Sequence, residues 1–480
     1  MNQLSSISRN GETTPLAAFD YEKGGLPKLV KYKNGSSIEM YYDHNRLNKY
    51  VLNSNTQEPL DTFTFQYDAN NNITKIDSKE NGVTSYTYDD KLDQLRKEEL
   101  PDGTTISYEY DEVGNRVSKS ITKSGDTKVT QYSYNDANQL VEAGEKSYQY
   151  DKNGNLKNDG SKEYIFNDLN QLEEIKDQTG KSIAKYTYDE EGKRISSTTG
   201  TGTIHYFYNG NQVIYETNSE NQTLREYTYN DAGQPLTMTL NGNTYYYLYN
   251  QHGDVIALTD ENSKEVASYT YDAWGNVLTQ SGDLASENPY RYAGYRYDEN
   301  THLYYLLARY YNPETGVFLS LDPVMGDIQN PITLNGYNYA NNNPVMFFDP
   351  DGELAIPKKV KKVLRSFINY IFNDFINNTV TNILLIAVPG GINAWLGRKM
   401  IMKEGFSMIR KKPYKKMIFN FITGGMSGYG LGQWGSDKIG KAQYVISKFF
   451  NYEKAFDKLW IGKKIDSALR KTRNYLLKRI

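Results

Sequence analysis

A short aromatic motif recurs along the first two thirds of this 480-residue chain. It reads aromatic, any residue, aromatic, then Asp or Asn, and a stretch that often contains Gly follows. Self-similarity of this kind is typical of a repeat architecture, in which each unit is one piece of supersecondary structure. Clear copies begin at Tyr86, Tyr108, Tyr132, Tyr148, Tyr186, Tyr227, Tyr269 and Tyr295, and looser copies centre on Tyr42, Tyr67, Phe166, Tyr208 and Tyr249.

The motif predicts a strand, a tight turn and a second strand in each unit. Alternation places both aromatic side chains on one face of a β-strand. Asp or Asn followed by Gly supplies side-chain-to-backbone hydrogen bonds and a positive φ, which a tight turn needs. No unit can bury its aromatic face alone, so the thirteen units are expected to stack into one large, mainly β structure.

The composition excludes several classes of site. The chain has no cysteine, which excludes disulfides, thiolate metal sites and thiol nucleophiles. Its four histidines, His44, His205, His252 and His302, leave little for a histidine-based site. We therefore expect neither a metal nor a cofactor. A mean hydropathy of −0.72 also excludes an ordinary multi-span membrane protein.

The charge is divided between two parts of the chain. Residues 353–480 contain 25 Lys and Arg against 7 Asp and Glu, a net charge of +18, whereas residues 1–352 carry −21. The change coincides with the turn-forming sequence Asp349-Pro350-Asp351-Gly352, which predicts a domain boundary there. Such asymmetry suggests that the basic part meets a polyanion or an anionic membrane, or that the acidic part shields it.

Residues 40–352 resemble the YD-repeat proteins, a family that includes Rhs proteins, teneurins, insecticidal toxin-complex proteins and wall-associated toxins of Gram-positive bacilli. The most specific segments are ARYYNPETGVFLSLDP and NGYNYANNNPVMFFDPDG. The resemblance implies a spiral β-sheet shell over residues 1–289, a Rhs-associated core that plugs the shell over residues 290–352, and a variable toxin domain over residues 353–480.

The resemblance also implies a biological setting. Proteins of this kind are secreted or associated with the cell wall, inhibit competing cells by a toxin that acts in the target cytoplasm, and are neutralised in the producer by a cognate immunity protein. Thirteen repeats are few for such a shell, and the start MNQLSSISRN lacks the features of a signal peptide. We expect the chain to be the C-terminal part of a longer protein or an orphan toxin cassette.

Self-cleavage is a further expectation from the resemblance, since several relatives cut themselves just past the core by means of aspartates. The chemistry needs two carboxylates that lie close enough to share a proton, so that one activates water and the other donates. The candidates are Asp298, Asp322 and Asp349. Asn312 stands where relatives often have aspartate, which removes one further carboxylate. Turn formation by Asp-Pro and Asp-Gly pairs is the plain alternative.

Residues 353–480 are predicted to form a mostly α-helical, basic toxin domain. We favour a metal-independent RNA nuclease that cleaves tRNA, because family members carry such tails and the positive charge suits a phosphate backbone. The segment contains no histidine, so catalysis would depend on a carboxylate base with Lys or Arg. The candidate carboxylates are Glu404, Asp457 and Asp466, and the candidate RNA-binding residues are Lys358, Lys359, Lys361, Lys362, Lys411, Lys412, Lys415 and Lys416.

Two alternatives stay open for the tail. Uncharged runs at residues 375–397 and 417–436 approach the length of a membrane span, so the tail could be a pore-forming or depolarising toxin, or could touch a membrane during delivery. Against insertion, Pro389-Gly390-Gly391 interrupts the first run, and buried core helices would explain both runs equally well. In the other alternative, the chain is a surface- or carbohydrate-binding repeat protein with an inert tail.

Overall fold

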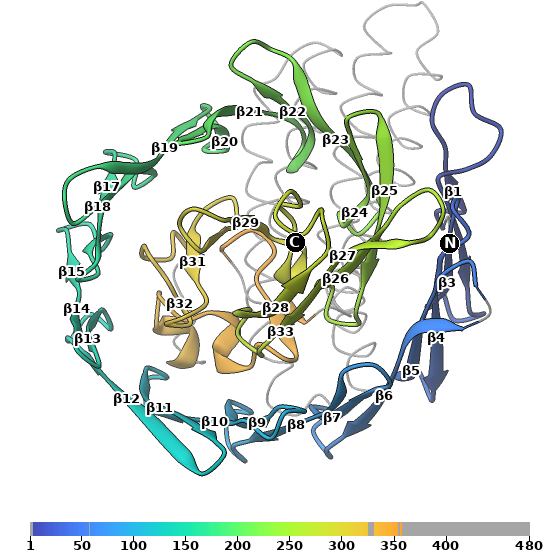
Figure 1. Cartoon of the computed structure of the whole chain (residues 1–480). Coiled ribbons are helices and arrows are strands. Elements are labelled where there is room, and N and C mark those ends of the chain that lie inside the picture. Colours follow the sequence, from blue (N-terminus) through green and yellow to red (C-terminus); the bar gives the residue numbers. More distant parts are fainter. Residues whose placement is uncertain (1–2, 57, 325–330, 354–355, 358–480) are drawn as a thin grey trace, which may run out of the picture. The chain divides into compact units, whose positions relative to one another are not determined.

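Two antiparallel β-sheets make up most of the structure (Figure 1). The computed structural model describes residues 3–56, 58–324, 331–353 and 356–357, and their architecture confirms the mainly β fold class. Each large sheet has 14 strands, and within each sheet every strand pairs with the strands before and after it in the sequence.

The first large sheet covers the N-terminal half of the repeats and the second covers the rest. The first comprises β1 (Ser6–Ile7), β2 (Ala17–Tyr21), β3 (Pro27–Tyr32), β4 (Ser37–Asp43), β5 (Arg46–Asn53), β6 (Pro59–Tyr67), β7 (Ile73–Ser78), β8 (Gly82–Tyr88), β9 (Leu95–Glu99), β10 (Thr105–Tyr110), β11 (Arg116–Lys123), β12 (Asp126–Tyr134), β13 (Leu140–Ala143) and β14 (Lys146–Ser147). The second comprises β15 (Gln149–Tyr150), β16 (Leu156–Asn158), β17 (Lys162–Phe166), β18 (Leu172–Asp177), β19 (Ser182–Tyr188), β20 (Arg194–Thr199), β21 (Gly202–Asn209), β22 (Gln212–Asn218), β23 (Thr223–Tyr229), β24 (Pro235–Leu240), β25 (Asn243–Tyr249), β26 (Val255–Thr259), β27 (Glu265–Tyr271) and β28 (Val277–Ser281).

Each repeat folds as the motif predicts, and β10–β11 shows why. Tyr108 and Tyr110 both lie on the buried face of β10. The next residue, Asp111, accepts a hydrogen bond at Oδ1 from the Asn115 backbone N–H (2.8 Å), which closes the turn. Gly114 adopts a φ of +80°, the left-handed conformation that favours glycine. The strand–turn–strand unit is therefore confirmed.

The second tyrosine of the motif also explains why the repeat prefers tyrosine to phenylalanine. The Tyr110 hydroxyl donates to the Leu95 carbonyl oxygen at 2.9 Å, and so connects the end of one strand to the start of the strand before it. This hydrogen bond gives a partner both to the carbonyl oxygen and to the buried hydroxyl group. The same kind of hydrogen bond is made by Tyr42, Tyr67, Tyr88, Tyr110, Tyr134, Tyr188, Tyr208, Tyr229, Tyr249 and Tyr271.

Strands β1 to β26, called the wall below, pass round in a ring whose last strands return to the first ones (Figure 1). Side chains make this junction, called the seam below. The Tyr32 hydroxyl donates to the Tyr247 carbonyl oxygen (2.8 Å), and Asn34 Nδ2 donates to the Asp260 carbonyl oxygen (2.7 Å). Arg9 adds a hydrogen bond to Thr239 (2.6 Å). Among the described strands, no backbone ladder crosses the seam.

Inside the wall lie the hairpin β27–β28 and residues 290–324 and 331–353, which are together called the inner segment below (Figure 1). The turn of that hairpin, residues 272–276, is called the inner turn below. The elements that follow are η1 (Tyr292–Gly294), β29 (Arg296–Asp298), β30 (Leu303–Tyr305), β31 (Tyr310–Asn312), β32 (Val317–Phe318), η2 (Pro331–Leu334), η3 (Ala340–Asn342), β33 (Phe347–Phe348) and β34 (Ile356–Pro357). Strands β29 to β32 form one small sheet, and β33 pairs with β34.

An asparagine-rich stretch, residues 335–343, fixes the inner segment to successive turns of the wall. Asn335 Nδ2 donates to Asn115 Oδ1 (2.6 Å), and Asn342 Nδ2 donates to the Gly114 carbonyl oxygen (2.6 Å). Asn343 Nδ2 reaches the Asp93 carbonyl oxygen (2.7 Å) of the neighbouring turn. These hydrogen bonds hold the inner segment against the wall, and the assignment of residues 290–352 as a plug stays a prediction. The proposed boundaries at residues 289/290 and 352/353 stay predictions.

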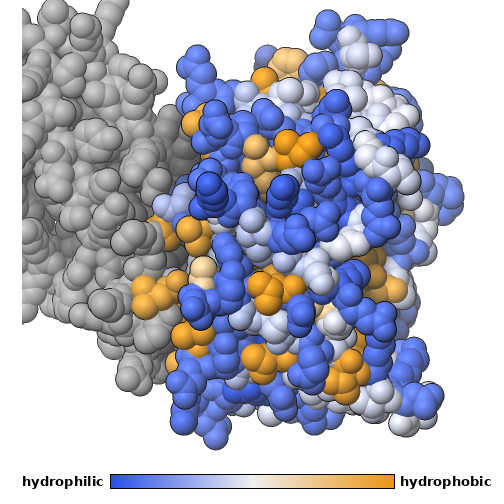
Figure 2. Space-filling model, turned by 90° about the vertical axis from the view of Figure 1, so that its left-hand side faces the viewer, coloured by the Kyte–Doolittle hydropathy of each residue, from blue (hydrophilic) through white to orange (hydrophobic). Residues whose placement is uncertain are grey.

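One side of the outer face of the wall is mostly hydrophilic. Figure 2 shows the side that lies on the left of Figure 1, where apolar side chains occur only in small separate groups. Leu169, in the turn between β17 and β18, is 76% exposed. Such scattered apolar residues are normal for a surface that faces water. The described part of the chain holds no helix that is long and apolar enough to span a membrane.

Candidate self-cleavage site

Arg309, immediately before β31, is the centre of a cluster that holds two of the three candidate aspartates. Its Nη2 lies 3.0 Å from Asp322 Oδ2 and 3.4 Å from Asp349 Oδ2. Nη1 donates to the Gly336 carbonyl oxygen (2.8 Å), and the guanidinium carbon lies 3.6 Å from the centre of the Phe318 ring. The sequence predicts two carboxylates that share a proton, and here both contact one guanidinium.

The same cluster surrounds one peptide bond, the one between Gly352 and Glu353. Arg309 Nε donates to the Gly352 carbonyl oxygen. Asp349 Oδ1 accepts from the Gly352 N–H (3.0 Å) and from the Glu353 N–H (3.1 Å). A guanidinium therefore contacts the oxygen of this peptide, and a carboxylate contacts its nitrogen.

Local structure explains why the chain can approach Arg309 so closely. Gly352 has a φ of +77°, and a Cβ at this position would lie 2.8 Å from the Leu306 carbonyl oxygen. Only glycine avoids both the strained conformation and the clash. The Asp349 N–H donates to the Tyr295 hydroxyl (2.9 Å), which fixes the start of this turn. The turn-forming composition of residues 349–352 thus places a backbone segment against charged side chains.

This arrangement has the parts that peptide hydrolysis requires. A guanidinium at the carbonyl oxygen can stabilise the oxyanion that forms when water attacks the carbonyl carbon. A carboxylate at the peptide nitrogen is placed to deliver a proton to the leaving amine. Asp322, whose side chain is 19% exposed against 3% for Asp349, is the carboxylate that solvent reaches more easily.

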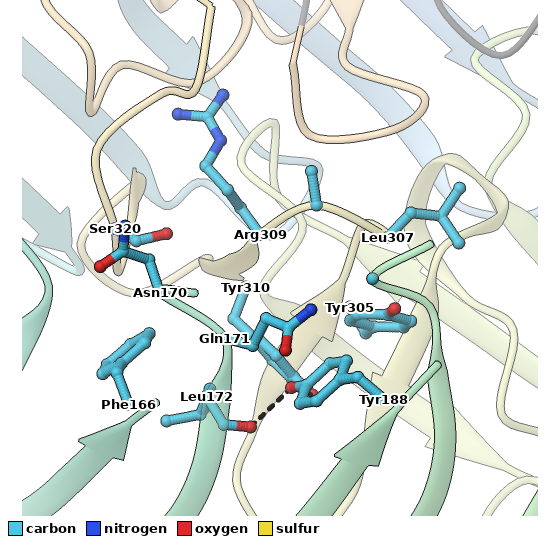
Figure 3. A pocket seen from close by; sticks show the side chains of 12 residues that line it. Phe166, Asn170, Gln171, Leu172, Tyr188, Tyr305, Leu307, Arg309, Tyr310 and Ser320 are labelled. Carbon is cyan, nitrogen blue, oxygen red and sulfur yellow. Dashed lines mark hydrogen bonds between the residues drawn. The ribbon is translucent and has the colours of Figure 1, made fainter. Parts of the chain in front are cut away.

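A pocket lies beside this cluster (Figure 3). The wall contributes Phe166, Gln171 and Tyr188, and the inner segment contributes Tyr305 and Arg309. In Figure 3 the Arg309 side chain extends away from the aromatic rings. The pocket is therefore lined by residues of both the wall and the inner segment.

Asp298, the third candidate, belongs to a different cluster. Both of its carboxylate oxygens contact the fully buried guanidinium of Arg194 on β20, with Oδ1 at 2.9 Å from Nη2. The Tyr186 hydroxyl also donates to it (3.1 Å). Asn312, where relatives often carry aspartate, accepts at Oδ1 from the Glu314 N–H (3.0 Å) and so closes the turn before β32.

Arg309 is not among the site residues that the sequence predicts. The residue stands inside the quoted segment ARYYNPETGVFLSLDP, but nothing in that pattern distinguishes a buried arginine from a solvated one. The nuclease candidates Glu404, Asp457 and Asp466 lie outside the described residues. So do the basic candidates Lys358, Lys359, Lys361, Lys362, Lys411, Lys412, Lys415 and Lys416.

The part of the chain that the structure describes contains no group of three or more His, Asp or Glu side chains suited to hold a metal ion. His252 lies in a repeat turn, where its Nδ1 is 2.6 Å from Asp254 Oδ1.

Sequence comparison finds bacterial relatives of much greater length. The chain is 43% identical over 356 residues to a protein named tRNA3(Ser)-specific nuclease WapA from Bacillus spizizenii, and 44% identical over 357 residues to one named tRNA nuclease WapA from Bacillus subtilis. Each match covers 73% of this chain. The chain spans only 15% of the length of either relative.

Comparison with solved structures finds the same fold in Tc toxins. The Photorhabdus luminescens Tc holotoxin pore matches with a TM-score of 0.61 at 20% identity, over 71% of this chain and 19% of that one. The TcdB2–TccC3 complex matches with a TM-score of 0.58 at 19% identity, over 72% of this chain and 20% of that one. At such low identity these matches show the fold alone. The family model described as Teneurin YD-shell matches residues 7–345, and the chain therefore belongs to the YD-shell family.

Proposed function

We propose that the protein is a YD-shell toxin in which the wall carries residues 353–480 as an RNA nuclease directed at tRNA. The identity of 43–44% to two proteins named tRNA nucleases carries this proposal. The net charge of +18 in residues 353–480 supports it, because a phosphate backbone attracts such a segment. In this proposal the protein is secreted or held at the cell wall, and a cognate immunity protein neutralises the toxin in the producing cell.

We also propose that the Arg309 cluster releases the toxin by hydrolysing the Gly352–Glu353 bond. Asp322 takes a proton from water as the water oxygen attacks the Gly352 carbonyl carbon, and Arg309 stabilises the oxyanion. Asp349, in its protonated form, gives its proton to the Glu353 nitrogen as the C–N bond breaks. The new Gly352 carboxylic acid passes its proton to the Glu353 amine, so the products are a Gly352 carboxylate and a Glu353 ammonium group. A proton passes from Asp322 back to Asp349 through solvent, which restores both aspartates.

Induction of residues 353–480 in bacteria tests the nuclease. We expect cleaved tRNA within minutes while the membrane potential is maintained. Early depolarisation with intact tRNA would contradict the nuclease and favour a membrane-active tail. If tRNA is cleaved, substitution of Glu404, Asp457 and Asp466 by alanine, one at a time, will identify the catalytic base.

Mass spectrometry of the purified full chain tests the self-cleavage. We expect a product that ends at Gly352 in the natural protein, and an intact chain in the variants Asp349→Asn and Asp322→Asn. Asp298→Asn serves as the control, because Asp298 contacts Arg194 rather than Arg309. An intact natural chain, or normal cleavage in Asp349→Asn, would rule out the proposed mechanism.

A further inference from the structure

A buried glutamate joins the wall to the inner turn. Glu98 on β9 is fully buried. Its Oε1 accepts from the Tyr108 hydroxyl of the neighbouring strand (2.7 Å), and its Oε2 accepts from the Ala273 backbone N–H (3.0 Å). Because 175 residues separate Glu98 from Ala273, one carboxylate connects two distant parts of the chain.

A second carboxylate lies beside it. Asp272, the residue before Ala273, is 5% exposed and accepts at Oδ1 from the Trp274 and Asn276 N–H groups (2.9 Å each). Within the described residues, neither Glu98 nor Asp272 forms an ion pair. An ionised carboxylate buried without a counter-ion is costly, and a second one nearby makes it costlier.

Other ionisable groups face this pair from β8, β10 and β11. Tyr86 and Tyr108 lie on β8 and β10, and both interact electrostatically with Glu98 and Asp272. Lys119 on β11 interacts with both carboxylates, but burial lowers the pKa of its ammonium group. The guanidinium of Arg116, also on β11, lies over the Trp274 ring at 3.9 Å from its centre.

Glu216 provides a natural contrast within the same molecule. It is also fully buried, and it also accepts from the tyrosine of the next strand, Tyr227, at 2.6 Å. In addition, Arg296 lies 2.8 Å from its Oε1 and Arg225 lies 3.1 Å from its Oε2. Burial raises the pKa of Glu216, but the two guanidiniums outweigh burial and leave this pKa below its usual value.

We propose that Glu98 and the inner turn form a proton-operated latch between the wall and the inner part of the shell. Protonated Glu98 keeps its two hydrogen-bond partners without burying a charge. Ionised Glu98 faces the Asp272 carboxylate and forms no direct ion pair among the described residues, so the inner turn is then held less firmly against the wall.

The electrostatics place the switch near neutral pH. Burial and the Asp272 carboxylate raise the pKa of Glu98 to about 7, although the Tyr108 hydroxyl, the Ala273 N–H and the Lys119 ammonium group each lower it. A group whose pKa is raised in the folded state contributes stability that is complete below its unfolded pKa and is lost as the pH rises through the folded value. The latch is therefore closed at mildly acidic pH and weakened above about pH 7.

The inner turn passes this change on to the plug. The Tyr292 hydroxyl donates to the Ala273 carbonyl oxygen (2.9 Å), and the Tyr311 hydroxyl donates to that of Trp274 (2.8 Å). The Tyr304 hydroxyl donates to the Gly275 carbonyl oxygen (2.8 Å). Three tyrosines of the inner segment thus hold the same turn that Glu98 contacts, so ionisation of Glu98 loosens the plug together with the turn.

Tryptophan fluorescence tests the latch directly, since Trp274 is the one tryptophan before residue 353. In the full chain with Trp395, Trp434 and Trp460 replaced by phenylalanine, we expect the emission of Trp274 to titrate with a midpoint near pH 7. Adding Glu98→Gln, which mimics the protonated side chain, should abolish this titration and fix the emission at its acidic value. Glu216→Gln is the matched control and should leave the midpoint unchanged.

Thermal unfolding provides a second readout that does not depend on fluorescence. We subtract the melting temperature of the natural protein from that of Glu98→Gln at each pH. This difference should increase by a few degrees between pH 5 and pH 9, because the variant avoids the buried charge. A flat emission in the natural background would overturn the latch. So would a titration that persists in Glu98→Gln, or a melting difference that does not change with pH.

Discussion

One hydroxyl group decides how strongly each repeat is connected to the repeat before it. In ten of the thirteen repeats the second tyrosine of the motif bonds to a backbone carbonyl 14 to 20 residues earlier in the chain. Removing the hydroxyl leaves that carbonyl without its partner while the ring still packs. The wall is therefore stabilised by many small, similar contributions rather than by one large core.

Tyr110→Phe tests this at a single repeat. The Leu95 carbonyl oxygen loses a buried hydrogen bond, so we expect the free energy of unfolding to fall by about 1–3 kcal/mol. Tyr41→Phe is the control, because Tyr41 is 45% exposed and bonds only to the side chain of Glu39. Urea denaturation of both variants would measure the difference, and equal effects would contradict the argument.

Asp298→Asn tests the contact between Arg194 and the inner segment. The variant leaves the fully buried guanidinium of Arg194 without its carboxylate, which costs about 3–5 kcal/mol of unfolding free energy when a buried pair is broken. We expect the loss to appear in denaturant unfolding while self-cleavage is retained by the folded fraction. A variant as stable as the natural protein would show that Arg194 is paired in another way.

At the scale of the element, the turn is the part of the repeat that has been adapted to different neighbours. Most turns face water, whereas the inner turn is buried and carries Trp274. Its Gly275 has a φ of +91°, and a Cβ there would lie 2.7 Å from the Tyr292 ring. The same turn geometry thus serves as a surface loop in the wall and as a packed contact inside it.

A turn can require glycine because the backbone has a positive φ or because there is no space for a Cβ. Gly275→Ala and Gly103→Ala distinguish these two requirements. Both residues have a positive φ, so both variants lose about 1–2 kcal/mol to left-handed strain. A Cβ at Gly103 meets nothing within 4 Å, whereas Gly275→Ala also displaces the Tyr292 ring. We expect the lower melting temperature in Gly275→Ala, and equal values would show that the inner turn is not packed as described.

At the scale of the molecule, the seam determines whether the wall is closed. Tyr32→Phe removes the hydrogen bond to the Tyr247 carbonyl oxygen across 215 residues of sequence. We expect faster amide hydrogen exchange in β25 as well as in β3. Tyr42→Phe loses a bond within the first sheet, to Pro27, and should affect only β3 to β5. Unchanged exchange in β25 of Tyr32→Phe would mean that the seam is open in solution.

The strands and turns could be predicted from sequence because they depend on neighbours close along the chain. The Y-x-Y-D pattern fixes both the buried face and the turn, as β10–β11 shows. The environment of a buried charge depends on distant residues instead. Nothing near Asp298 indicates that Arg194 contacts it, and the sequence around Glu98 does not reveal that it lacks the arginines that surround Glu216. The sequence predicts Asp322 and Asp349 as site residues, but it does not predict Arg309, whose guanidinium contacts both of them.

The order of the strands has a consequence for how the molecule is made. After the first strand of each large sheet, every strand pairs with the one just before it, so each new strand finds its template already in place. Such local pairing avoids the slow search that distant strand partners require. The wall can therefore assemble in the direction of synthesis, or of threading through a channel, and residues 290–353 emerge when the ring that they fill has been built. The segment that the ring encloses is then made only after the strands that enclose it.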